Sequence, residues 1–193
     1  MSLVLATRNA HKAREFAALL HGVEILPLPD GVELPAETGD SFAANALPKA
    51  QAAARATARP AFADDSGIEA RALGGAPGVR SARFAGEGAS DADNLAALIA
   101  QAPPGSALAY VCVIALVDPR SGDEHLFEGR CTGSMAAAPR GTGGFGYDPI
   151  FVPDDRDDGR TMAELDQAEK DAISHRGRAA RALLAHLQSA AVS

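Results

Sequence analysis

Two adjacent carboxylates, Asp64 and Asp65, follow a short apolar run and precede Ser66 and Gly67. Because glycine adopts φ > 0 without strain, the chain can turn after Ser66, so we predict a strand that ends with both carboxylates at its tip. Adjacent carboxylates repel one another unless a cation holds them or a solvated turn disperses them. Taken alone, this stretch fits a metal site and an acidic turn equally well.

A second polar group precedes this pair. Asn45 and Lys49 lie four residues apart in the longest helical pattern, residues 43–58, so they share one helix face. Glu37 lies just before that helix. A carboxylate, an amide and an ammonium in this order suit a metal–phosphate ligand, although an ordinary exposed face would look the same. Pro48 lies inside the helix, where proline costs about 3 kcal/mol or forces a kink.

The N-terminal segment contains a candidate anion site. Residues 3–6 are predicted to form a strand, and a helical pattern runs from Lys12 to a stop at Gly22, with Asn9 as N-cap. Free backbone N–H groups at a helix start attract anions, and Lys12 adds a full positive charge. A plain capped helix with a solvated lysine is the alternative interpretation.

A glycine-rich stretch, residues 140–149, has four glycines within six residues and ends on Phe145, Tyr147 and Asp148. Glycines let a backbone approach a ligand closely, and an aromatic ring can stack on a base. The stretch is no Walker loop, because it lacks the closing Gly-Lys-Ser/Thr. A flexible surface loop is the alternative.

The last helix is predicted to begin after Ser174, which places His175 and Arg176 in its first turn. Cations at that end oppose the helix dipole, so their position favours a nearby anion or carbonyl-rich ligand. A solvent-exposed pair is the alternative.

Composition narrows the function classes. The formal net charge of the 193 residues is −7, which argues against broad binding to nucleic acid or to anionic membranes. Cys112 and Cys131 are too few for a disulfide framework. The start of the chain is too short and not basic enough for a signal sequence, and no apolar run approaches the length of a membrane span. We therefore expect a cytoplasmic protein.

The remaining elements indicate an α/β fold with a mixed sheet. We expect strands at residues 23–28 and 60–64, a central strand buried on both faces at 107–117, and its hairpin partner at 126–134. A helix is expected from residue 91 to 102, and residues 161–164 have the spacing of a capping box.

Together the polar motifs resemble one family, the inosine triphosphate pyrophosphatases, over about residues 3–188. The resemblance is carried by five motifs in order, namely residues 7–9 with Lys12, 37–39 with Phe42, Asn45 and Lys49, 64–67, 143–149, and 174–176. Arg8, where many members have glycine, and Pro48 depart from the family pattern. The resemblance implies one domain, residues 1–193, with an elongated mixed β-sheet flanked by helices and two lobes around a nucleotide cleft. It also implies a homodimer.

The resemblance further implies Mg²⁺-dependent hydrolysis of dITP, ITP and XTP to the nucleoside monophosphate and pyrophosphate. Glu37 and Asp65 would hold the metal, Asp65 would also accept the proton of the attacking water, and Asp64 would be a nearby second carboxylate. The implied substrate-binding residues are Thr7, Arg8, Asn9, Ala10, His11, Lys12, Lys49, Ser66, Phe145, Gly146, Tyr147, Asp148, Lys170, His175 and Arg176.

In this interpretation Phe145 stacks on the purine. Donors from Lys170, His175 and Arg176, with Asp148 or the backbone as acceptor, match the keto form of the base and leave adenine poorly paired. The sequence does not explain how guanine would be excluded. Two other functions stay open: a pyrophosphatase for other modified nucleotides, and a nucleotide-binding module without catalysis.

Overall fold

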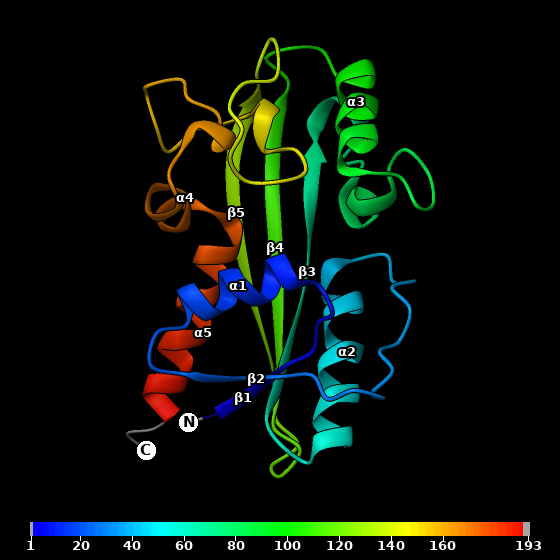
Figure 1. Ribbon diagram of the computed structural model, residues 1–193, viewed down its shortest axis with the longest axis vertical. Helices are drawn as coiled ribbons and strands as arrows, with labels where there is room; N and C mark the ends of the chain where they lie inside the picture. Colours follow the sequence, from blue (N-terminus) through cyan, green and yellow to red (C-terminus); the bar gives the residue numbers. More distant parts are fainter. Residues whose placement is uncertain (1, 191–193) are drawn as a thin grey trace. The chain divides into compact units, whose positions relative to one another are not determined.

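The computed structural model describes residues 2–190. Six strands form one sheet in the order β2-β1-β3-β4-β5-β6 (Figure 1). β1 runs parallel to β2 and β3, whereas β5 and β6 are antiparallel, so the predicted mixed α/β sheet is confirmed. The strands are β1 (Ser2–Leu5), β2 (Glu24–Pro27), β3 (Ala61–Ala70), β4 (Ala107–Val117), β5 (Glu124–Met135) and β6 (Phe151–Pro153).

The helices agree closely with the expected patterns. They are α1 (Ala10–Leu19), α2 (Phe42–Thr57), α3 (Asp91–Gln101), α4 (Gln167–Ile173) and α5 (His175–Ala190), with 3-10 turns η1 (Arg71–Leu73), η2 (Gly78–Arg83), η3 (Asp148–Ile150) and η4 (Met162–Glu164). Pro48 does not end α2, which runs through it. No helix within residues 2–190 is long and apolar enough to cross a membrane.

The chain divides into two compact units. Unit 1 comprises the residues up to 65, residues 112–129 and those from 176 onward, and unit 2 comprises residues 66–111 and 130–175. The expectation of one domain with two lobes around a nucleotide cleft stays a prediction.

In unit 1 the two faces of the strands build separate apolar clusters, because successive side chains of a strand point to opposite faces. One cluster joins the strands to α1 and α5 and includes Leu3, Leu5, Phe16, Phe62, Cys112, Ile114, Ala180 and Leu183. The other joins them to α2 and includes Val4, Ala46, Ala50, Ala53, Ala61, Ala63, Ala115 and Val117. On β3, the odd positions 61 and 63 therefore face α2, and the even position 62 faces α1 and α5.

Unit 2 has its own core. It combines those parts of β3, β4 and β5 that belong to unit 2 with α3 and the segments around β6 and η4. Its buried members include Ile68, Leu98, Leu108, Tyr110, Cys131, Tyr147, Ile150, Phe151 and Met162. The predicted capping box is present at the start of η4, where Thr161 and Glu164 exchange side-chain to backbone hydrogen bonds.

The strand containing the acidic pair does not end where the sequence pattern indicated. β3 continues through Asp64, Asp65 and Gly67 to Ala70, so the predicted turn after Ser66 is wrong. Gly67 is needed for a different reason: a Cβ there would lie 2.4 Å from both the Gly78 carbonyl oxygen and Ser81 Oγ. The glycine permits close approach of a neighbouring segment, and the carboxylates lie in mid-strand.

Candidate active site

The two adjacent carboxylates point to opposite faces of β3. Asp64 continues the even series and faces α1 and α5, whereas Asp65 continues the odd series and faces α2. Both side chains are buried, with Asp64 2% and Asp65 5% exposed. The acidic-turn interpretation is therefore wrong, and the two carboxylates have separate surroundings.

Asp64 is surrounded by cations. Its Oδ2 lies 3.0 Å from Lys12 Nζ and 3.4 Å from Arg176 Nη2, and the Cys112 thiol lies 3.9 Å away. Burial raises the pKa of Asp64, but the positive charges of Lys12, Arg176 and Lys49 together outweigh it, so the pKa lies well below the usual range. Asp64 is therefore ionised at neutral pH, and burial raises the pKa of the neighbouring Cys112 thiol.

Arg176 is buried between two carboxylates. Its Nη1 donates to Glu15 Oε2, its Nη2 donates to Asp64, and its guanidinium lies 5.6 Å from the centroid of the Phe16 ring. Burial lowers the pKa of Arg176, but the negative charges of Asp64 and Glu15 and the hydrogen bond to Glu15 together with Cys112 outweigh it, so the net shift is upward. The anions expected near the start of α5 are thus protein carboxylates, and the solvent-exposed interpretation of Arg176 is wrong.

Asp65 is joined to the segment before α2 by one amide. Asn45 Nδ2 donates to Asp65 Oδ2 at 2.9 Å, while Asn45 Oδ1 accepts from the Gly39 N–H at 2.8 Å. A Cβ at Gly39 would lie 2.8 Å from Asn45 Oδ1, so glycine permits this contact. Asn45 therefore holds the chain that includes Glu37 close to Asp65.

Lys49 completes this side of the site. Its ammonium donates to Glu37 Oε1 and, at 2.7 Å, to the backbone carbonyl of Asp64. Lys49 is only 6% exposed, so the exposed-face interpretation of this helix side is wrong. The pKa of Asp65 is raised: burial is the largest cause, and the negative charge of Glu37 adds to it despite the Asn45 hydrogen bond. A carboxyl group with a raised pKa suits a general base.

The donor set on this face fits Mg²⁺. This ion prefers one or two carboxylates and takes its remaining ligands from water and substrate phosphates. Glu37, partly exposed, and Asp65 supply two carboxylates. Residues 2–190 contain no group of three or more His, Cys, Asp or Glu side chains that could hold a metal ion. On the opposite face of β3, the Asp64 carboxylate has one oxygen, Oδ1, that is buried and has no hydrogen-bond partner among the described residues.

The start of α1 is capped by its own chain. Asn9 Oδ1 accepts from the N–H groups of His11 and Lys12 at 2.9 and 3.2 Å, so the predicted N-cap is confirmed and an anion would compete with it. Thr7 Oγ1 accepts from the Asn9 N–H at 3.1 Å. The Lys12 ammonium, in the first turn of α1, lies 3.0 Å from Asp64 Oδ2.

Arg8 points elsewhere. Its guanidinium donates to the carbonyl oxygens of Leu28, Pro29 and Val32 at 3.0, 2.8 and 3.1 Å. The residue that departs from the family pattern thus supports the chain after β2. The substrate-binding roles of Thr7, Arg8, Asn9, Ala10, His11 and Ser66 stay predictions.

The glycine-rich segment of unit 2 is organised around Asp148. Asp148 Oδ1 accepts from the Tyr110 hydroxyl at 3.0 Å, and Oδ2 accepts from Lys170 Nζ at 2.7 Å and from the Phe145 N–H at 3.0 Å. The Gly146 N–H donates to Asp91 Oδ2 at 3.1 Å. These contacts fix the backbone of residues 145 and 146, unlike that of a flexible surface loop.

The aromatic residues of this segment have different surroundings. The Tyr147 hydroxyl donates to the Ser81 carbonyl at 2.7 Å, and the side chain belongs to the unit 2 core. Phe145 is only partly buried, and Lys170 Nζ lies 5.1 Å from the centroid of its ring. Phe145 is therefore the ring better placed to stack on a ligand. His175 is buried and stacks on Tyr110, with centroids 4.7 Å apart.

Sequence reasoning missed the roles of Tyr110 and Glu15. Tyr110 lies in the central strand pattern and Glu15 in the first helical pattern. No motif in either pattern indicated the contacts that these side chains make. The role of Asn45 could have been found, because its four-residue spacing from Lys49 already placed both side chains on one face.

Comparison with known proteins agrees with these motifs. Residues 3–186 match the model of the Ham1 family. A protein of Symbiobacterium thermophilum named dITP/XTP pyrophosphatase is 55% identical over 92% of this chain and 90% of its own length. A Geobacillus kaustophilus protein of the same name is 49% identical over 92% of this chain and 89% of its own.

A solved structure agrees as well. The HAM1 protein from Coxiella burnetii matches with a TM-score of 0.87 and 41% identity, over 98% of this chain and 99% of that one. The predicted relationship to nucleotide pyrophosphatases is therefore confirmed, and the chain belongs to the Ham1 family.

Proposed function

We propose that this protein hydrolyses non-standard purine nucleoside triphosphates, namely dITP, ITP and XTP, to the monophosphate and pyrophosphate. The observation that supports this proposal most is the difference between the two carboxyl groups of β3. Cations surround Asp64 and lower its pKa, whereas Asp65 lies beside Glu37 and has a raised pKa. Relatives named dITP/XTP pyrophosphatase support the substrate class. Mg²⁺ dependence, a homodimer and a cytoplasmic location belong to the proposal as expectations from the family resemblance.

The α2-facing group performs the phosphate chemistry in this proposal. Asp65 accepts the proton of the attacking water, and the Asn45 amide fixes the carboxylate orientation. Lys49 holds Glu37 and the Asp64 backbone in place. Mg²⁺, when held by Glu37 and Asp65, supplies the positive charge that neutralises the phosphates. Lys12 is the cation that the α1 start contributes to phosphate binding.

The Asp148 group recognises the base. Phe145 offers a ring face, and Lys170 is a donor held beside that face by Asp148. A 6-keto purine accepts from such a donor, whereas the 6-amino group of adenine is itself a donor and cannot accept a hydrogen bond from the lysine. His175, buried against Tyr110, belongs to the same expected recognition set. The base contact of Arg176 stays a prediction, because its guanidinium pairs with Glu15 and Asp64.

A nucleotide panel tests this selectivity. Initial rates of pyrophosphate release are measured with ITP, dITP, XTP, GTP and ATP at equal concentration, with Mg²⁺ and with a chelator. We expect the first three to be hydrolysed at least about 100-fold faster than ATP, because a site built on hydrogen bonds rejects the wrong pattern strongly. We also expect the chelator to abolish turnover. Equal rates on all purines, or full activity with the chelator, would refute the proposal.

A further inference from the structure

The two residues proposed to recognise the base belong to separate segments. Phe145 lies in the glycine-rich loop and Lys170 in α4, yet both donate to Asp148 Oδ2, at 3.0 and 2.7 Å. Lys170 Nζ also lies 5.1 Å from the centroid of the Phe145 ring. Their relative position therefore depends on the contacts that fix the loop and the helix.

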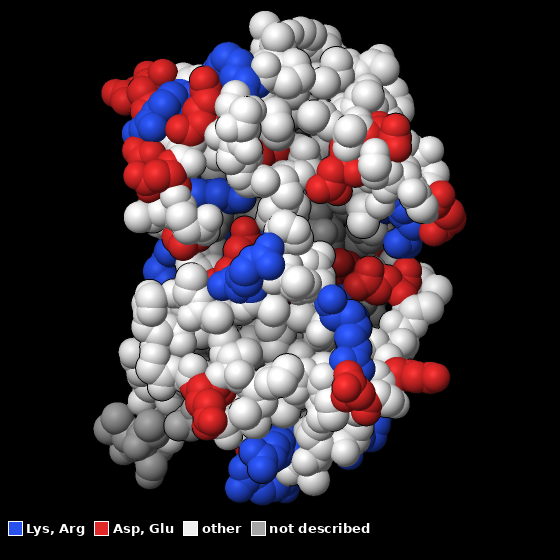
Figure 2. Space-filling model, in the orientation of Figure 1, with Lys and Arg blue, Asp and Glu red and all other residues white. Residues whose placement is uncertain are grey.

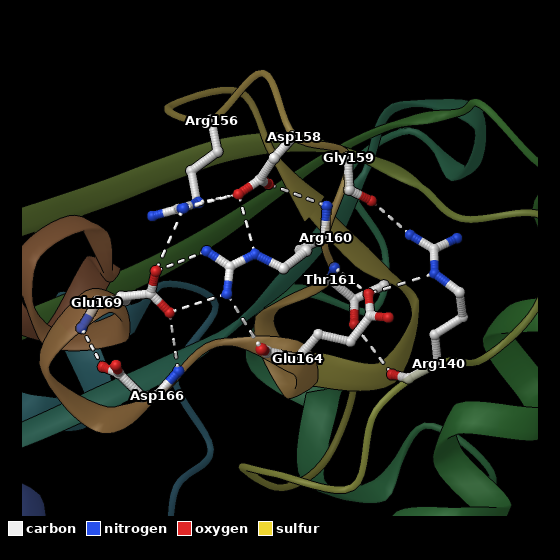
Figure 3. A network of polar contacts seen from close by, with 9 residues as sticks. All are labelled: Arg140, Arg156, Asp158, Gly159, Arg160, Thr161, Glu164, Asp166 and Glu169. Carbon is white, nitrogen blue, oxygen red and sulfur yellow. Dashed lines mark hydrogen bonds and ion pairs between the residues drawn. The ribbon is translucent and has the colours of Figure 1, made fainter.

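α4 is too short to be stable without support, since isolated helices of this length are marginal at best. Its capping box joins Asp166 to Glu169, the residue directly before Lys170. The Glu169 carboxylate accepts two parallel hydrogen bonds from Arg160, from Nη2 to Oε1 at 2.5 Å and from Nη1 to Oε2 at 3.0 Å (Figure 3). Such two-pronged pairs fix geometry as well as charge.

Arg160 is itself held in orientation. Its Nε donates to Asp158 Oδ2 at 2.9 Å, and Arg156 Nη2 donates to the same oxygen at 2.6 Å (Figure 3). Both arginines belong to a highly charged segment, residues 154–160. In the structure it holds a guanidinium against the start of α4.

The network also reaches the glycine-rich loop. Arg140, at the start of that loop, donates from Nε to Glu164 Oε2 at 3.2 Å and from Nη2 to the Gly159 carbonyl (Figure 3). The buried Thr161 hydroxyl donates to the Arg140 carbonyl at 2.9 Å. Arg160 Nη1 lies 3.5 Å from the Glu164 backbone carbonyl, which links the two groups of contacts (Figure 3). One network of polar contacts in residues 140–169 thus contacts both the loop that leads to Phe145 and the helix that carries Lys170.

We propose that Arg160 is a positioning residue for base selection. Its two hydrogen bonds to the Glu169 carboxylate determine where Lys170 lies relative to Phe145. This inference rests on the proposed function. The polar contacts of Arg160 are with Asp158, Glu164 and Glu169, not with the base-recognition side chains themselves. Its loss therefore weakens discrimination between bases while leaving the phosphate chemistry intact.

The test compares Arg160→Gln with the wild-type protein on ITP and ATP. We expect the ratio of kcat/KM for ITP over ATP to fall about 10-fold, mainly through a higher KM for ITP, because small misplacements of a binding group are costly. The kcat for ITP should change by no more than about 2-fold. Arg120→Gln, in an exposed 3.8 Å pair with Asp118, is the matched control and should leave the ratio unchanged.

A second variant tests the Arg160–Glu169 ion pair from its other partner. Glu169→Gln keeps an oxygen that can accept from the Asp166 N–H, so the cap survives while the ion pair with Arg160 is lost. We expect a loss of discrimination here too. Arg156 Nη2 also lies 3.2 Å from Glu169 Oε1, and Arg160 also donates to Asp158, so each substitution removes a further contact. The double variant should nevertheless lose less than the sum of the two single variants, because both break the Arg160–Glu169 pair. Salt at about 1 M should lower the ratio in the wild type more than in Arg160→Gln, because the pair is partly exposed.

The outcomes separate this inference from the proposed function. A wild-type preference for ITP that persists unchanged in a folded Arg160→Gln protein would overturn the inference alone. Additive effects of the two substitutions, or a fall in kcat with an unchanged ratio, would also overturn it. A wild type without any preference for ITP would remove the proposed function and this inference together. If Arg160→Gln is not recovered folded, Glu169→Gln decides.

Discussion

Asp65→Asn should reduce kcat for ITP by at least about 1,000-fold, because the amide can neither accept the water proton nor offer a full charge to Mg²⁺. The substitution should leave the fold intact. Asparagine has nearly the same shape, and its side-chain oxygen still accepts from Asn45 Nδ2, the donor that lies 2.9 Å from Asp65 in the native protein. Removing a carboxyl whose pKa is raised by burial also removes an electrostatic cost.

The measurement is steady-state pyrophosphate release combined with urea unfolding of the same preparation. A kcat within about 10-fold of the wild type would show that Asp65 is not the base. A large loss of unfolding free energy would show that the activity fell through misfolding. Asp40→Asn, a change of an exposed carboxylate before α2, is the matched control and should affect neither quantity.

Asp64→Asn should differ from Asp65→Asn in its effect on stability and lower the unfolding free energy by about 3 kcal/mol. Removing one partner of a buried ion pair leaves the other charge uncompensated. Here Arg176, with a side chain 4% exposed, and Lys12 would both face a neutral amide that itself carries donors. Arg176 keeps Glu15 as a partner, which limits the loss to the lower end of the range for buried pairs.

Urea denaturation at neutral pH measures this difference, with Asp65→Asn as an isosteric control one residue along the same strand. Equal stability of the two variants would contradict this expectation. It would show that water or a movement of Lys12 compensates for the lost charge, and that the Asp64 ion pairs contribute little to the stability of the fold. Activity should also decrease in Asp64→Asn, because Lys12 loses the carboxylate that fixes it.

Most of the fold could be predicted from the sequence because local patterns determine it. The long apolar run gave β4 with its observed ends, α3 begins at the expected residue 91, and α5 begins after Ser174 as expected. β3 was predicted wrongly because Gly67 was interpreted through its freedom to turn. Its actual requirement is a close tertiary approach of Gly78 and Ser81, which no local pattern reveals.

The separation of the two carboxylates was within reach of sequence reasoning, since a period of two assigns neighbours on a strand to opposite faces. The prediction of a turn concealed it. The partners of Asp64 could not be predicted, because Cys112 and Arg176 meet Asp64, and Glu15 meets Arg176, only through packing of α1, β4 and α5. Charge counts gave no direct indication either, since acidic and basic side chains are interspersed on the face that Figure 2 shows.

The most direct test of the proposed function identifies the products of ITP hydrolysis in the presence of Mg²⁺. The purified protein is incubated with ITP, and inosine monophosphate, inosine diphosphate, pyrophosphate and orthophosphate are quantified by ion-exchange chromatography through the time course. We expect inosine monophosphate and pyrophosphate to appear together in equal amounts, with cleavage confined to the bond between the α- and β-phosphates. Inosine diphosphate with orthophosphate as the first products would contradict the proposed function.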